Sequence, residues 1–289
     1  MKKSRLCNFL LLSMVAAMVM AGCKSSKKAT KETVSQSPEV TEAASNEVIV
    51  TEDTEVSAID IVTLEELEGI TLTATEQAHN IYHGMFGEEE GILSLWFDRQ
   101  MQEAQISFVG AYHSEKLSFS CELLEDGVRY HDDKFYLLLR QQAGDILTGY
   151  FYERGMELKE VNLALQAINY SQDKEHLYQV GSNEEVEGFA QKVLDAINAY
   201  DFEAFSSYVA FPVYAHVNQA VQLIETKEDF MELGEDVIFT DEFTAAMAAA
   251  YADIMFANEE DGVLLGDGSY NVWMNLDTEG KLKVICINN

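Results

Sequence analysis

The chain has 289 residues, of which 47% are apolar and 10% aromatic, so one or two folded domains with cores of their own are expected. Its formal net charge of −31 excludes nucleic acid as a partner, because phosphate binding needs clustered Lys and Arg. The four cysteines form no CxxC pair and no Cys/His spacing typical of a metal site, so neither a metal nor a cofactor is expected.

Residues 1–22 have the order of parts of a secretory signal peptide. The basic residues Lys2, Lys3 and Arg5 precede an apolar run from Leu6 to Met20. This run is shorter than the roughly 20 residues that a membrane-spanning helix needs. We therefore expect a signal that is cleaved rather than an anchor that stays attached.

The apolar run leads into Met20-Ala21-Gly22-Cys23. This sequence resembles the lipobox of bacterial lipoproteins, in which the cysteine is diacylated and becomes the new N-terminus. The resemblance implies that Cys23 carries acyl chains such as palmitate. It also implies that the protein is anchored at the extracytoplasmic face of a bacterial membrane. The alternative is an ordinary cleaved signal in which Cys23 has no role.

Residues 23–64 are predicted to be a disordered, acidic tether. They contain no aromatic residue and no glycine, so they cannot bury enough apolar surface to offset the entropy lost on ordering. Lys24, Lys27, Lys28 and Lys31 cluster just after the lipidation site. Each would add about 1 kcal/mol of attraction to anionic headgroups.

Residues 65–178 are predicted to form an antiparallel β-meander domain, closed as a barrel or folded as a sandwich. Short apolar runs alternate with turn residues at intervals of about ten residues. Gly149, before Tyr150, is interpreted as a strand bend. The expected strands are 81–86, 92–97, 106–112, 117–123, 134–139, 146–152 and 158–165.

Residues 183–289 mix helix and strand signals. Ser182 and Glu185 have the spacing of a capping box, followed by apolar residues at helical spacing as far as Ile197. Asp201 and Thr226 are expected to cap further helices. An Ala-rich helix is predicted at 241–256. The expected strands are 213–224, 263–265, 270–276 and 282–287.

This order of elements resembles the NTF2-like (SnoaL-like) superfamily. The residues that carry the resemblance are 189–205, Phe211-Pro212-Val213, 226–230, 262–273 and 284–289. The resemblance implies an α+β cone that encloses an apolar pocket. The expected fold class is therefore α+β, with the β-meander domain followed by an NTF2-like cone on the lipid-anchored tether.

Tyr214, His216 and Asn218 share one face of their predicted strand by period-two alternation. Together with Trp273 they are the candidate binding residues of the pocket that the resemblance implies. Because family enzymes place an Asp or His there for acid/base work, His216 is the candidate catalytic residue. The alternative is that this face meets solvent while Val213, Ala215 and Val217 face the core.

Three functions remain open from the sequence. The first is a non-catalytic binding protein for a small apolar ligand or an envelope protein. The second is a SnoaL-like extracytoplasmic enzyme with His216 as acid/base, and the third is an inhibitor or docking lipoprotein. Motifs such as G-x-S-x-G, HExxH or a phosphate loop are absent, which favours the first. Cys121 and Cys286 are expected to be buried thiols, with an interdomain disulfide as the alternative.

Overall fold

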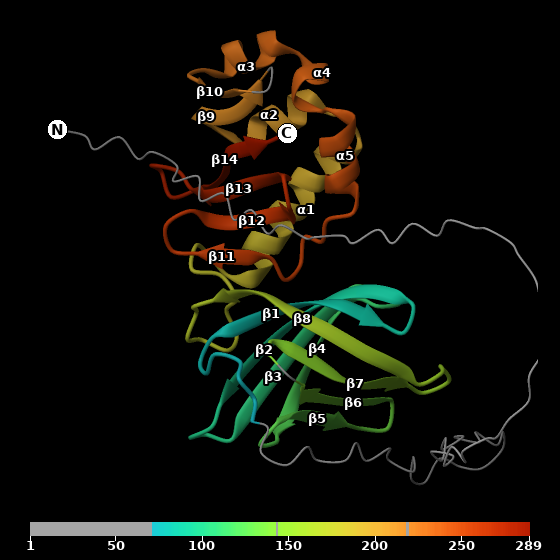
Figure 1. The fold of residues 1–289 in the computed structure, drawn as a ribbon. Coiled ribbons are helices and arrows are strands. Elements are labelled where there is room, and N and C mark those ends of the chain that lie inside the picture. Colours follow the sequence, from blue (N-terminus) through green and yellow to red (C-terminus); the bar gives the residue numbers. More distant parts are fainter. Residues whose placement is uncertain (1–70, 143, 218–219) are drawn as a thin grey trace, which may run out of the picture. The chain divides into compact units, whose positions relative to one another are not determined.

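The computed structural model describes residues 71–142, 144–217 and 220–289, which belong to one compact unit. The expected signal peptide, the expected tether and Cys23 lie outside the described residues. The described chain forms a closed barrel and a six-stranded sheet (Figure 1). No helix in these ranges is long and apolar enough to cross a membrane.

The barrel is formed by antiparallel strands and closes because β1 pairs with both β2 and β8. The closing register joins Tyr82 to Leu165 and Phe86 to Val161. The strand β5 is missing from the predicted set, because five residues are too short to give a clear alternation. The strands are β1 (His79–Phe86), β2 (Glu89–Asp98), β3 (Glu103–Gly110), β4 (His113–Leu123), β5 (Gly127–His131), β6 (Phe135–Gln141), β7 (Ile146–Glu153) and β8 (Lys159–Asn169).

Side chains fill the inside of the barrel. On β2, Leu93, Leu95 and Phe97 point inward and are at most 1% exposed. The ring of Phe108 stacks on Phe86 with centroids 5.3 Å apart and meets Phe151 edge-on at 5.2 Å. Eight strands enclose just enough space for such packing, so this interior is a hydrophobic core.

Glycine lets neighbouring strands of the barrel approach each other closely. A Cβ atom built on Gly149 would lie 1.8 Å from the carbonyl oxygen of Leu138, well inside contact distance. No side chain fits there without a backbone shift. Gly149 therefore permits a close approach of β6 and β7, whose register is regular at this point, and no bend is needed to explain the glycine.

The C-terminal sheet has the strand order β10-β9-β14-β13-β12-β11. Neighbouring strands are antiparallel except β14 and β9, which run parallel. The predicted strand at 213–224 is two antiparallel strands instead, because the chain reverses between Val217 and Ala220, which pair with each other. The strands are β9 (Val209–Val217), β10 (Ala220–Ile224), β11 (Phe256–Asn258), β12 (Gly262–Asp267), β13 (Tyr270–Leu276) and β14 (Leu282–Asn288).

Helices pack on one face of this sheet, and α1 runs behind it in the view of Figure 1. The predicted capping box is confirmed: Ser182 Oγ accepts from the Glu185 N–H at 3.3 Å, and the Glu185 carboxylate accepts from the Ser182 N–H at 3.2 Å. Asp201 and Thr226 also cap helices as predicted. The helices are α1 (Asn183–Asn198), α2 (Phe202–Tyr208), α3 (Lys227–Leu233), α4 (Glu235–Ile238) and α5 (Asp241–Ala248).

The predicted fold class is wrong. The described chain is mostly β, with 48% of residues in strands and 20% in helices, and its second part is not an NTF2-like α+β cone. The helix predicted at 241–256 ends at Ala248, and Ile254 adopts a positive φ of 54°, which a helix cannot continue through. Helical spacing in the sequence therefore overstated how much of this region is helix.

Candidate functional site

Strand β9 carries two different sets of side chains on its two faces. Val213, Ala215 and Val217 are at most 3% exposed and pack in the core with the helices. Tyr214 and His216 alternate with them, so they lie on the opposite, outer face of the sheet and are partly exposed. Of the two arrangements expected from the sequence, the structure shows the one in which Val213, Ala215 and Val217 face the core and Tyr214 and His216 lie on the other face.

The register of the sheet places Tyr214 in a row of apolar side chains that crosses every strand. Tyr214 is paired with Leu223 on one side and with Cys286 on the other. Cys286 is in turn paired with Trp273, which is another of the site residues predicted from the sequence. We call the following six residues the outer row: Leu223, Tyr214, Cys286, Trp273, Leu264 and Phe256.

The outer row is partly open to solvent. Leu223 is 44% exposed at one end, whereas Cys286, the third residue of the row, is 3% exposed. Phe256 meets Trp273 edge-on with ring centroids 6.1 Å apart. Five strand spacings of about 4.8 Å give the row a length of about 24 Å. An apolar stripe of this length is too long for one small molecule and suits a protein surface.

The opposite face of the same strands explains why the row points outward. Ala215, Ile287 and Val272 form the equivalent row on the inner face, where all three are at most 1% exposed. That inner row packs with α1, α2 and α5 in one core. Among the described residues, the members of the outer row do not belong to this core.

His216 lies beside the outer row rather than in it. It is paired with Val221, which is 41% exposed on β10, and its backbone N–H donates to Asn289 Oδ1 at 3.1 Å. A general base works best in a site that excludes water, and an open sheet face does not provide one. Asn218 lies outside the described residues.

The other candidates from the sequence lie elsewhere. Cys121 is buried in the barrel core, where burial raises the pKa of its thiol to about 12, and it forms no disulfide with any described residue. Among residues 71–142, 144–217 and 220–289, no group of three His, Cys, Asp or Glu side chains is arranged to hold a metal ion.

Sequence reasoning found two members of the outer row, Tyr214 and Trp273, and missed the other four. Alternation along one strand shows which residues share a face, but it does not show which strands are neighbours. The pairing of β14 with β9 brings Cys286 beside Tyr214. This pairing joins segments far apart in the sequence, so no local pattern predicts it. No protein-family model, curated protein or solved structure matches this chain.

Proposed function

We propose that this chain is a lipid-anchored, extracytoplasmic, non-catalytic binding protein that docks onto an envelope protein through the outer row. The single observation that carries the docking role is the continuous apolar row from Leu223 to Phe256, which is partly exposed along one face of the sheet except at the buried Cys286. The lipobox-like sequence at Cys23 supports the anchor, and the acidic, aromatic-free residues 24–64 support a spacer.

The composition of the outer row is that of a recognition surface. Tyr and Trp are enriched at the centres of protein interfaces, where they bury large area and lose little conformational entropy. Tyr214 on β9 and Trp273 on β13 lie on either side of β14, which is one of the two central strands of the sheet. They are therefore the expected anchors of the contact.

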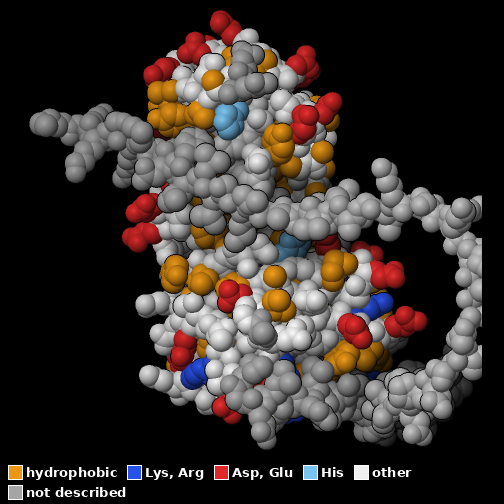
Figure 2. All heavy atoms as spheres, viewed as in Figure 1, with side chains coloured by type: hydrophobic (Ala, Val, Ile, Leu, Met, Phe, Trp, Pro, Cys, Tyr) orange, Lys and Arg blue, Asp and Glu red, His pale blue; other side chains and the backbone are white. Residues whose placement is uncertain are grey.

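The negative charge of this chain indicates the charge expected on the surface of its partner. The chain has 50 acidic and 19 basic residues, and red carboxylates clearly outnumber blue cations in the view of Figure 2. Such a surface attracts a positively charged partner and repels an anionic one. The partner that fits is a protein with an apolar strip bordered by Lys and Arg.

Site-specific crosslinking in the source bacterium tests the docking role. The photoreactive residue p-benzoylphenylalanine replaces Leu223 at the exposed end of the row, or Met156 in the β7–β8 turn as the control. We expect one dominant crosslinked protein from position 223, lost when Trp273→Ser is added, and no such product from position 156. The same product from both positions would contradict the proposal.

The anchor needs its own test. Mass spectrometry of the N-terminal peptide from membrane fractions should find Cys23 as the first residue, carrying a diacylglyceryl group. Cys23→Ser should release the protein from the membrane fraction. A mature chain that starts elsewhere, or an unmodified Cys23, would overturn the lipoprotein assignment and leave the docking role standing.

A further inference from the structure

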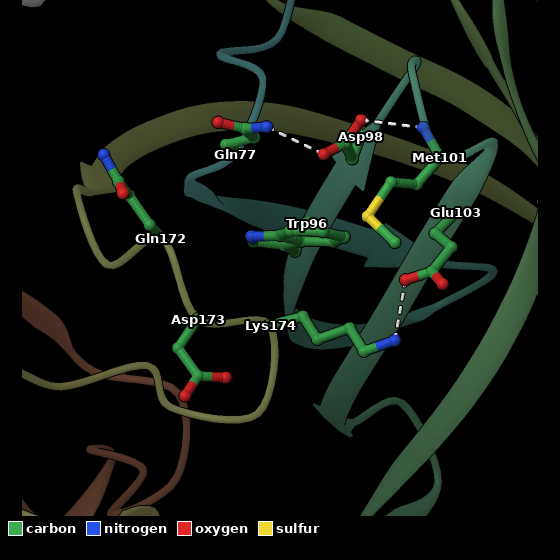
Figure 3. A pocket seen from close by; sticks show the side chains of 8 residues that line it. All are labelled: Gln77, Trp96, Asp98, Met101, Glu103, Gln172, Asp173 and Lys174. Carbon is green, nitrogen blue, oxygen red and sulfur yellow. Dashed lines mark hydrogen bonds and ion pairs between the residues drawn. The ribbon is translucent and has the colours of Figure 1, made fainter.

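A hollow of about 390 Å³ lies on the outside of the barrel wall, far in sequence from the outer row. Strands β2 and β3 form its floor, and the segment that follows β8 forms one side (Figure 3). Its volume is at the low end of the range found for small-molecule sites. The side chains that line it are Gln77, Trp96, Asp98, Met101, Glu103, Gln172, Asp173 and Lys174.

Trp96 is the side chain in this hollow whose hydrogen bonding is incomplete. The residue is 4% exposed, and its indole Nε1–H is buried with no partner among the described residues. Figure 3 shows this nitrogen turned toward Gln172 and Asp173. A buried N–H without an acceptor costs about 1–3 kcal/mol, and native structures rarely keep one without a reason.

The carboxylates of the hollow are already held in place. Asp98 accepts from Gln77 Nε2 at 2.7 Å and from the backbone N–H groups of Gln100 and Met101. Glu103 pairs with Lys174 at 2.7 Å. These bonds leave further acceptor positions on both carboxylates, because each carboxylate can accept about four hydrogen bonds.

These contacts limit the chemical classes of ligand that can bind in the hollow. The free donor of Trp96 needs an acceptor oxygen, which a metal or ammonium cation does not have. Asp98, Glu103 and Asp173 outnumber the one ammonium group of Lys174, so an anion is repelled. A neutral hydroxyl meets both conditions, since its oxygen accepts from Trp96 while its hydrogen donates to a carboxylate.

We propose that this hollow binds a neutral sugar, with the Trp96 Nε1–H donating to one of its hydroxyl oxygens. Asp98 and Glu103 accept from neighbouring hydroxyls, and Lys174 donates to a further oxygen. Because the indole nitrogen is itself buried, the exposed side chain of Gln172, toward which it is turned, moves aside to let the sugar hydroxyl reach it. The hollow shares no residue with the outer row, so this proposal stands or fails separately from the proposed function.

The two tryptophans of the chain make the test selective, because each proposed surface has one of its own. In the Trp273→Phe variant, the remaining indole N–H resonance belongs to Trp96. It is followed by ¹H–¹⁵N NMR during titration with glucose, galactose, mannose, maltose, cellobiose and lactose. We expect at least one sugar to move this resonance downfield in a saturable manner.

Variants then test the site itself. Trp96→Phe keeps an aromatic ring but removes the donor, and it should weaken sugar binding by about fivefold, the value of one hydrogen bond. Gln172→Tyr should obstruct the hollow, whereas Gln179→Tyr, at another exposed position of the same segment, should bind normally. These two variants keep the test decisive if Trp96→Phe disturbs the fold.

Two results would overturn the sugar site. One is a Trp96 resonance that no sugar in the set moves. The other is a resonance that moves only with N-acetylglycinamide, a peptide-like probe, because the hollow would then recognise amides rather than hydroxyls.

Discussion

Tyr214 and Trp273 lie on either side of Cys286 in one row across the C-terminal sheet, although 59 positions separate them in the chain. Each is partly exposed, and neither belongs to the core that the helices cover. Their substitution should therefore affect binding more than folding, which distinguishes a recognition surface from a structural one.

The first prediction tests that distinction. Tyr214→Ser and Trp273→Ser should each abolish the crosslink from position 223 while lowering the free energy of unfolding by about 1 kcal/mol or less. Val213→Ser, on the same strand but fully buried, should cost several times more stability. Urea unfolding followed by circular dichroism measures all three variants. If Tyr214→Ser and Trp273→Ser lost as much free energy of unfolding as Val213→Ser, the outer row would serve to stabilise the fold rather than to bind a partner.

The second prediction concerns glycines with opposite surroundings. Gly149→Ala should destabilise the barrel by about 2 kcal/mol or more, because its new Cβ would meet the Leu138 carbonyl. Gly188→Ala, at an exposed position inside α1 where the new Cβ would meet nothing within 4 Å beyond the adjacent residues and backbone of its own helix, should stabilise the fold by about 1 kcal/mol. Thermal unfolding measures both. A stabilised Gly149→Ala variant would show that the close approach of β7 to the Leu138 carbonyl is not needed.

The third prediction concerns a charged cluster at the start of α1. Glu187 accepts from Lys116 of β4 and from the Tyr178 hydroxyl at 3.3 Å, and burial is the main reason that the pKa of Glu187 is raised. Tyr178 in turn accepts from the Met255 N–H at 3.2 Å. The cluster therefore ties β4 to α1 and to the segment before β11 within this unit.

Lys116→Met should lower the free energy of unfolding at pH 7 by about 3 kcal/mol, because it leaves the Glu187 carboxylate without its cation. Adding Glu187→Gln should recover much of this loss. The loss in Lys116→Met should shrink as pH falls, since protonation of Glu187 removes the uncompensated charge. A loss that does not depend on pH would mean that the lysine acts by packing alone.

The fourth prediction concerns His79, which is 2% exposed. Its Nε2–H donates to the Asp173 backbone oxygen at 3.0 Å, and its Nδ1 accepts from Ser94 Oγ at 3.1 Å. Burial lowers the pKa of His79 below its usual 6.5. As pH falls through 6.5 the unfolded chain takes up a proton that the folded chain does not, so His79 contributes stability above that pH and loses it below.

His79→Gln should remove this part of the pH dependence. The wild-type protein should lose up to about 1.4 kcal/mol per pH unit more than the variant between pH 6.5 and 5.5, and the difference between them should be constant above pH 7.5. Chemical denaturation at several pH values measures both. Parallel curves over the whole range would exclude a lowered pKa.

The sequence predicted local features better than pairings. The alternation at 92–97 correctly predicts β2, and the capping box at Ser182 correctly predicts the start of α1, because both depend on a few neighbouring residues. The closure of β1 on β8 joins residues far apart in the sequence, so barrel and sandwich remained equal alternatives.

The candidate site was predicted only in part for the same reason. Tyr214 and His216 were singled out by alternation on one strand, but alternation alone does not show which face meets the core. That choice depends on where α1, α2 and α5 pack, and these helices cover the face of Val213. The sequence did not indicate a role for Trp96, because an N–H donor without an acceptor can be recognised only when the atoms around it are known.

The most direct test of the docking role uses Trp273 as its own reporter. In the Trp96→Phe variant, Trp273 is the only tryptophan, and its fluorescence is recorded while the protein captured by the crosslink is added. We predict a saturable blue shift, because docking removes water from the partly exposed indole. Unchanged Trp273 emission at concentrations where the two proteins bind, measured by calorimetry, would contradict the account.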